Sequence, residues 1–138
     1  MLILDTNVIS ETMQPMPSAR VMGWWAQQQA GELFVTTVTI AEILYGIEIL
    51  PQGKRRAALL AGAERMFGNV LASHILSFDE EAARAFAEIA ASRRSQGRPI
   101  AELDAQIAAI ASSRRAMLAT RNTADFEGCG VRLVNPWQ

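Results

Sequence analysis

The chain has 138 residues, about the length of one domain, and a formal net charge of −1. Half of its residues are hydrophobic and a fifth are charged, which is typical of a folded globular protein and excludes a disordered chain. The charge balance excludes a strongly basic surface, so any binding of nucleic acid must be local. No apolar run approaches the ~20 residues of a membrane span. We therefore expect a single domain, residues 1–138, located in the cytoplasm and away from membranes.

The first half of the chain predicts two buried strands, each followed by a helix. The apolar run 2–4 ends abruptly at Asp5 and is too short for a helix, which favours a strand. Asn7 can cap a helix that begins at residue 8, and Ser18 can cap another helix after two prolines. A second strand is predicted at 33–35. The helix after it has apolar residues at spacings of three and four: Ile40, Ile43, Leu44, Ile47 and Leu50.

The second half continues this alternation. Helices are predicted over 55–67, from residue 78 or 79 to about 94, and over 101–115. The last of these has an apolar stripe of Leu103, Ile107 and Ile110. Brief strands are predicted over 75–76, 117–119 and 131–134. Short buried strands that alternate with helices imply a parallel sheet covered on both faces. We therefore expect an α/β fold of three layers, α/β/α, around a central parallel sheet of four to five short strands.

Three acidic side chains are predicted near the edge of the sheet where the strands end. Asp5 directly follows the first strand, Glu42 is in the second turn of the helix after the second strand, and Asp104 is in the first turn of its helix. In open parallel sheets this edge is where ligands bind. Each residue also has a structural interpretation: Asp5 could cap a helix, Glu42 could be a solvated surface acid, and Asp104 could simply favour a helix N-terminus.

The segment after the fourth strand begins at the same edge. It contains Thr120, Arg121, Asn122 and Asp125, and one helical turn there would place Asn122 and Asp125 on one face, with Phe126 in the core. The alternative is that Asp125 only caps or solvates the loop. Carboxylates that converge repel one another and stay ionised only beside a cation. Because their oxygen atoms are hard ligands, they select Mg²⁺ or Mn²⁺.

Four motifs, in this order, resemble those of the PIN domain: Leu4-Asp5-Thr6-Asn7, Thr39-Ile40-Ala41-Glu42, Leu103-Asp104-Ala105-Gln106-Ile107-Ala108-Ala109 and Ala119-Thr120-Arg121-Asn122. The resemblance covers essentially the whole chain and is closest to the VapC toxins of bacterial toxin–antitoxin pairs. The ending Asn135-Pro136-Trp137 is similar to the FitB-like branch. It implies a Mg²⁺-dependent ribonuclease, with Mn²⁺ as the other suitable ion. It also implies a homodimer, and a small DNA-binding antitoxin that blocks the site.

The resemblance also implies roles for individual residues. The acidic positions, which hold the metal and serve catalysis, are matched by Asp5, Glu42 and Asp104. The polar positions that line the pocket are matched by Thr6, Asn7 and Thr120. Many relatives have aspartate where this chain has Asn122. We therefore expect Asp125 to be a fourth catalytic and metal-binding carboxylate, while Arg121 and Asn122 complete the substrate pocket.

Two other classes of function stay open. A receiver-like signalling module also has an acidic pocket on a parallel sheet, but it uses a lysine late in the chain, and the only lysine here is Lys54. A non-catalytic protein that only binds an antitoxin is the second alternative, because Asn122 adds no negative charge.

The remaining polar and aromatic residues predict surface roles. Cys129 cannot form an internal disulfide and is expected to be a surface thiol, and His74 is expected in a loop. The pair Arg93-Arg94 favours a solvated helix face, whereas Arg98 and Arg121 are expected nearest the crevice. The adjacent residues Trp24 and Trp25 cannot both face one core fully, so at least one is expected to be partly exposed or at a dimer interface.

Overall fold

A single parallel sheet organises the computed structural model, which describes all residues from 1 to 138. Its strands are β1 (Leu2–Leu4), β2 (Leu33–Thr36), β3 (Ile75–Leu76), β4 (Met117–Ala119) and β5 (Leu133–Val134). They lie in the order β3-β2-β1-β4-β5, and every neighbouring pair is parallel. The predicted parallel sheet is thus confirmed, with five strands. β5 is shorter than predicted and begins two residues later.

Six helices connect and cover the strands: α1 (Thr6–Thr12), α2 (Ala19–Ala26), α3 (Thr37–Glu48), α4 (Lys54–Arg65), α5 (Glu80–Ser95) and α6 (Glu102–Ser113). Three short turns of helix add to them, at Ala30–Glu32, Met66–Val70 and Thr123–Phe126. None of the helices has the length and apolar character needed to cross a membrane.

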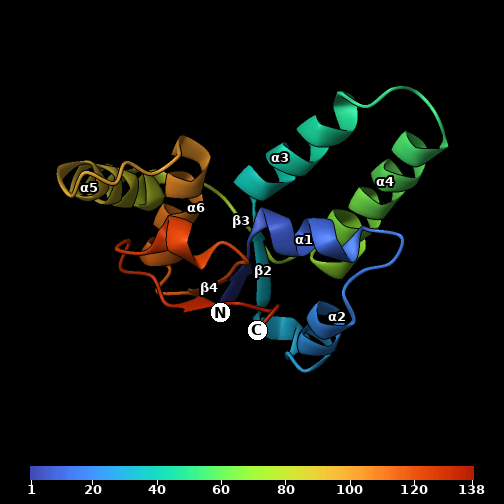
Figure 1. Cartoon of the computed structure of the whole chain (residues 1–138), viewed down its shortest axis with the longest axis horizontal. Helices are drawn as coiled ribbons and strands as arrows, with labels where there is room; N and C mark the ends of the chain where they lie inside the picture. The colour runs from blue at the N-terminus through green and yellow to red at the C-terminus, as the bar shows by residue number, and fades with distance from the viewer.

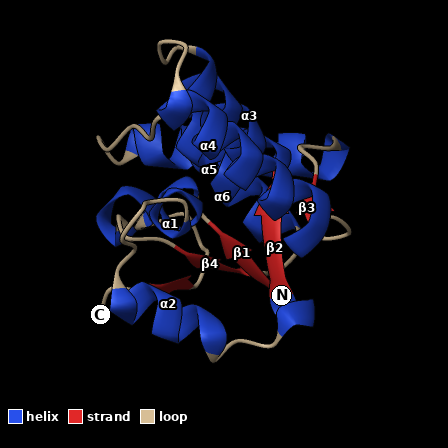
Figure 2. Ribbon diagram, turned by 90° about the vertical axis from the view of Figure 1, so that its right-hand side faces the viewer, coloured by secondary structure: helices blue, strands red, loops and turns tan.

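The helices form a layer on each face of the sheet, as Figures 1 and 2 show. Helices α5 and α6 cover one face, whereas α1, α2 and α4 cover the other, with α3 between the two groups. Alternation within β1 divides the core accordingly, because Ile3 packs with α5 and α6 while Leu4 packs with α1 and α4. The three-layer α/β/α prediction is therefore confirmed.

The strand order determines where a ligand site can form. From β1 the chain first builds the sheet in one direction, through β2 and β3, and then returns to add β4 and β5 on the other side. Connections therefore diverge between β1 and β4, and this switch opens a crevice at the carboxyl ends of those two strands. Asp5 follows β1 and Thr120 follows β4, and the Asp5 amide donates to the carbonyl of Ala119 at 2.9 Å.

Helix ends and faces differ from the sequence prediction in three places. Asp5, not Asn7, is the N-cap of α1, because its carboxylate accepts a bond from the amide of Thr6. In α3 the buried side includes Val38 and Thr39, while Leu44 is 37% exposed. Leu103 is 46% exposed, since α6 packs through residues from Ala105 onward.

Two side chains that were expected at the surface are buried. Cys129 is 5% exposed and belongs to the core beside α5 and α6. Arg93 is also 5% exposed, so this part of the Arg93-Arg94 prediction is wrong. Its guanidinium is buried because it finds hydrogen-bond acceptors in the segment 125–129, which a helical pattern alone does not reveal.

Candidate functional site

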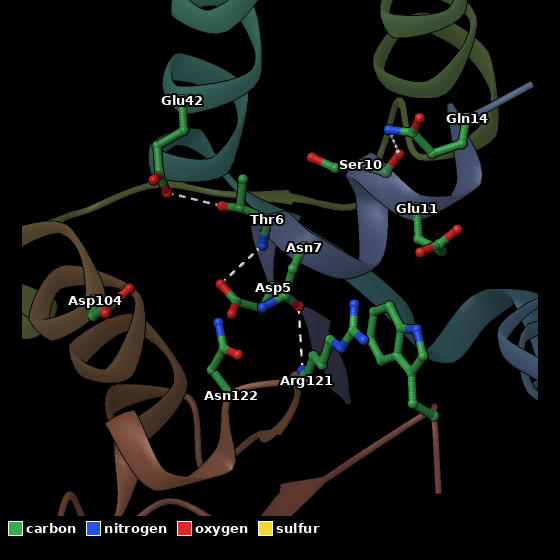
Figure 3. Close-up of a pocket in the computed structure, with 11 residues that line it drawn as sticks. Asp5, Thr6, Asn7, Ser10, Glu11, Gln14, Glu42, Asp104, Arg121 and Asn122 are labelled. Atoms are coloured by element: carbon green, nitrogen blue, oxygen red, sulfur yellow. Dashed lines mark hydrogen bonds between the residues drawn. The ribbon is translucent and has the colours of Figure 1, made fainter. Parts of the chain in front are cut away.

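A cleft of about 420 Å³ opens at the carboxyl ends of β1 and β4. Ten of the eleven residues that line it are polar or charged. Its carboxylates come from Asp5, Glu11, Glu42 and Asp104, and its only basic side chain is Arg121. Figure 3 shows Asp5, Glu42, Asp104 and Asn122 extending from four different elements toward the same space. The structure thus brings the three carboxylates of the sequence prediction together.

Asp5 lies at the bottom of this cleft and is only 4% exposed. One carboxylate oxygen accepts the amide of Thr6 at 2.8 Å, and the other accepts the hydroxyl of Thr120 at 2.7 Å. Burial raises the pKa of Asp5; the two hydrogen bonds oppose that rise, while the charges of Glu42 and Asp125 add to it. Asp5 therefore both caps α1 and faces the cleft, so its two interpretations are compatible.

Thr120 and Asn7 fix the geometry around Asp5. Because the Thr120 hydroxyl donates to Asp5, it can accept in return, and it does so from the amide of Asn122 at 3.1 Å. The side-chain amide of Asn7 donates to the same hydroxyl at 3.5 Å, and its carbonyl accepts the amide of Arg121 at 3.2 Å. These contacts join the start of α1 to the segment after β4.

Glu42 is oriented by two threonines. The hydroxyl of Thr6 donates to the Glu42 carboxylate at 2.8 Å, and the hydroxyl of Thr39 lies 3.0 Å from that of Thr6. Since Thr6 uses its single proton on Glu42, Thr39 is the donor in the second contact. Glu42 is therefore not a freely solvated acid, and the interpretation of it as a solvated surface residue is wrong.

Asp104 extends from the first turn of α6 into the cleft and is partly buried. Its pKa is raised to about 6, first by burial and then by the negative charges of Asp5, Asp125 and Glu42. The residues one and two turns later on the same face, Ala108 and Ala111, are fully buried. As expected from the sequence, small side chains let α6 approach the sheet closely while the carboxylate faces the cleft.

Asp125 belongs to the helical turn Thr123–Phe126, in which its amide donates to the carbonyl of Asn122 at 3.0 Å. The predicted turn is confirmed, and Phe126 anchors it in the core at 1% exposure. Asn122 lines the cleft. The Asp125 side chain is exposed and does not line the cleft, yet its charge raises the pKa of both Asp5 and Asp104.

The donor set suits a hard divalent cation. Carboxylates that raise one another's pKa are relieved by a positive charge, and oxygen atoms are the ligands that Mg²⁺ and Mn²⁺ prefer. No three acidic, histidine or cysteine side chains lie close enough to ligate one ion directly. Mg²⁺ does not need such a cage, because it is commonly bound through one or two carboxylates with water and substrate phosphate as the other ligands. The acidic lining of the cleft therefore fits such an ion.

The mouth of the cleft contains residues that the sequence analysis did not select. The guanidinium of Arg121 lies 5.2 Å from the ring centroid of Trp137, a cation–π contact. Helix α1 adds Ser10, Glu11 and Gln14 to the lining. Together with Asn7 these residues follow the spacing 7, 10, 11, 14, a polar stripe that could have revealed them.

Other expectations are settled outside the cleft. Arg98 does not line it and instead pairs with Glu127 at 3.3 Å, so its predicted place near the crevice is wrong. His74 lies before β3, where its Nδ1 contacts the carbonyl of Leu33 at 2.8 Å and its ring stacks on Phe34. Trp24 and Trp25 both pack against the same core cluster but are only partly buried, which confirms the prediction that at least one of them is partly exposed.

Known proteins resemble this chain over its whole length. The chain is 37% identical to the VapC ribonuclease Y4jK of Sinorhizobium fredii, and the similarity covers 100% of this chain and 99% of that protein. It is 36% identical to the toxin FitB of Neisseria gonorrhoeae over 99% of both chains. A solved structure of FitAB bound to a DNA fragment contains a chain with a TM-score of 0.93 and 36% identity, covering 100% of this chain and 96% of that one.

The PIN domain profile matches residues 2–128, which include every residue of the carboxylate cleft except Trp137. Sequence motifs, strand order and cleft geometry agree with that match. The chain therefore belongs to the PIN domain family.

Proposed function

We propose that this chain, acting as a single domain, is a metal-dependent endoribonuclease and the toxin of a two-protein toxin–antitoxin pair. The observation that supports this most is the convergence of Asp5, Glu42 and Asp104 on one open cleft, where their negative charges repel one another. Relatives that cover the full chain are a named ribonuclease and a named toxin. Membership of the PIN family disfavours the receiver-like alternative. The late part of the chain also lacks the lysine that a receiver domain uses.

In this proposal Mg²⁺ or Mn²⁺ is held by Asp5 and Asp104, with Glu42 and Asp125 contributing charge directly or through water. The ion supplies positive charge beside the phosphodiester and makes water a better nucleophile at neutral pH. Burial raises the pKa of Asp5, but the two hydrogen bonds that it accepts favour its ionised form and so support this role. Thr6 and Thr39 hold Glu42 facing the same space.

Arg121 is suited to bind the RNA backbone. It is the only basic side chain in an otherwise acidic cleft, and phosphate contacts come chiefly from arginine and lysine. Its main chain is held on both sides, because its amide donates to Asn7 and its carbonyl accepts from Asn135 at 3.3 Å. Contact with the Trp137 ring restrains its guanidinium. Asn122 lies next to it in the cleft and completes this substrate pocket.

Cleavage of a defined RNA by purified protein, with Mg²⁺ and with excess EDTA, tests the function. We expect cleavage that EDTA abolishes, and nearly complete loss of activity in Asp5→Asn and Asp104→Asn. Glu88→Gln is the matched control, because Glu88 is an exposed acid on α5 outside the cleft. Full activity in EDTA would refute the metal, and wild-type rates in both aspartate variants would refute the site. Failure to cut any RNA would favour the non-catalytic alternative.

We also propose that a small DNA-binding antitoxin silences the cleft. The FitAB structure was solved with DNA, and the acidic cleft of this chain is complementary to a basic side chain. An arginine of the partner placed near Asp5 and Asp104 would form charge-assisted hydrogen bonds and compete with the cation. The complex is then expected to cut RNA more slowly and to bind Mg²⁺ more weakly than the free protein. An equally fast complex would refute this mode of inhibition.

A further inference from the structure

Arg93 is a buried cation without an acidic partner. It lies on α5, its side chain is 5% exposed, and none of the ion pairs in the structure includes it. Burying a guanidinium away from any counter-charge is costly unless its N–H groups are fully bonded. Its retention in the core therefore depends on the groups it contacts.

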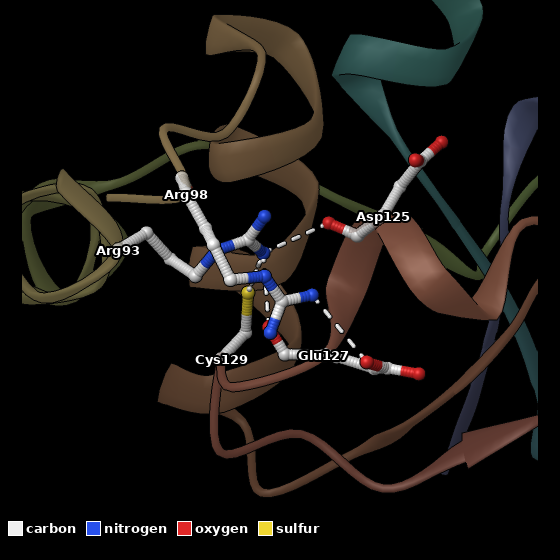
Figure 4. Close-up of polar contacts among 5 residues, drawn as sticks. All are labelled: Arg93, Arg98, Asp125, Glu127 and Cys129. Carbon is white, nitrogen blue, oxygen red and sulfur yellow. Dashed lines mark hydrogen bonds and ion pairs between the residues drawn. The ribbon is translucent and has the colours of Figure 1, made fainter. Parts of the chain in front are cut away.

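Those groups are main-chain carbonyls of the segment that follows β4. Nη1 of Arg93 donates to the carbonyl of Asp125 at 2.9 Å and to that of Glu127 at 3.0 Å, and lies 3.5 Å from the Cys129 sulfur. Nε donates to the carbonyl of Arg98 at 2.7 Å. Figure 4 shows the guanidinium of Arg93 on the inner side of the 125–129 segment, with the Asp125 carboxylate extending the other way.

The segment packs closely against α5. Gly128 has a φ of +79°, a left-handed conformation that favours glycine, and a Cβ there would lie 3.2 Å from Oε1 of Gln96 and, in ordinary contact, 3.7 Å from Cδ of Arg93. Phe126 and Cys129, on either side of Glu127 and Gly128, are both buried. Bonds from a charged donor to carbonyls are stronger than neutral ones, so Arg93 restrains the path of this backbone.

We propose that Arg93 is a positioning residue for the fourth carboxylate of the site. By holding the carbonyl of Asp125, it fixes the turn from which the Asp125 side chain extends, and so fixes the position of that carboxylate. This inference rests on the proposed metal-dependent function, because Asp125 matters only if a cation binds beside it. Arg93 itself does not line the cleft and acts through the backbone alone.

The test is a double-mutant cycle on the full chain, read by calorimetric titration of Mg²⁺ in the absence of RNA and by the Mg²⁺ dependence of cleavage. Arg93→Met keeps an unbranched side chain but removes every donor. We expect it to raise the Mg²⁺ dissociation constant about 10-fold, as loss of an outer partner of a metal ligand commonly does. Asp125→Asn should raise it by a similar factor, and adding Arg93→Met to Asp125→Asn should have little further effect.

Two more variants keep the test decisive. Arg98→Gln removes an exposed side-chain contact to the same segment, the bond to Glu127, and should leave Mg²⁺ binding unchanged. Arg93→Lys keeps the charge and some donors, so it should fold and show an intermediate shift even if Arg93→Met does not fold. Unchanged Mg²⁺ binding in Arg93→Lys and Arg93→Met, or additive effects with Asp125→Asn, would overturn the positioning role. Absence of RNA cleavage by the wild-type protein would instead refute the proposed function.

Discussion

Asp104 makes a quantitative test of the carboxylate cleft possible without RNA. Its pKa rises from the usual 3.8 to about 6 in the folded protein, so ionising it costs folding free energy. At about 1.4 kcal/mol per pH unit, that rise corresponds to about 3 kcal/mol. Because the side chain is only partly buried, solvent screening reduces the expected cost to about 1–2 kcal/mol.

The pH at which this cost operates follows from the two pKa values. Below pH 3.8 the carboxyl is protonated in both the folded and the unfolded state, so it costs nothing. Between pH 3.8 and about 6 the unfolded state ionises first, so wild-type stability falls as the pH rises. Above that range the penalty is constant. Asp104→Asn removes it, and should therefore gain stability relative to wild type as the pH increases from 4 to 8.

Thermal unfolding in EDTA measures this difference. For a chain of this size about 1–2 kcal/mol corresponds to roughly 3–6 °C in Tm. The Tm of Asp104→Asn minus that of wild type should therefore be larger at pH 8 than at pH 4 by roughly 3–6 °C. Glu88→Gln should show no such trend. Adding Mg²⁺ at pH 8 should stabilise wild type and leave Asp104→Asn nearly unchanged. A Tm difference that is the same at pH 4 and pH 8 would refute the raised pKa of Asp104, and with it the burial and charge repulsion that cause the rise.

Three further outcomes are expected. Asp125→Asn should lower cleavage and raise the Mg²⁺ concentration for half-maximal rate far more than Asn122→Ala; if it is silent, the site works with the other three carboxylates alone. Trp137→Ala should raise KM for RNA about 2- to 5-fold with kcat nearly unchanged, because a cation–π restraint on Arg121 is worth about 0.5–1 kcal/mol. An unchanged KM would contradict the proposal that Arg121 binds the RNA backbone. Sedimentation should show a homodimer, and a monomer at micromolar concentration would contradict the homodimer that the family resemblance implies.

The parts of the site next to strand ends were predictable from the sequence. Asp5 and Thr120 follow β1 and β4 directly, and a parallel sheet places such ends at one edge whatever the details of packing. Glu42 and Asp104 lie within the first two turns of α3 and α6, which begin near the same edge. Short apolar runs bounded by polar residues identified all of the strands, since strands buried on both faces have little polar content.

The parts that depend on distant packing were not predictable. Arg93 has the spacing of a solvated helix residue, and its acceptors are 32 and 34 residues further along the chain. Cys129 is buried in the core beside α5 and α6, where its sulfur lies 3.5 Å from that guanidinium. Leu103 fits an apolar stripe in the sequence but is 46% exposed, because α6 packs through residues from Ala105 onward. In each case packing against other elements decides whether the side chain is buried, and the local periodicity of the sequence does not reveal that packing.

The bond between Thr120 and Asp5 joins residues 115 positions apart. A growing polypeptide therefore has its first carboxylate almost at once but gains the hydroxyl that orients it only when β4 has been synthesised and docked beside β1. Contacts of such large sequence separation form late in folding, after the loop between them has closed. A chain shortened before β4 therefore lacks the hydroxyl that orients Asp5, and with it the finished cleft.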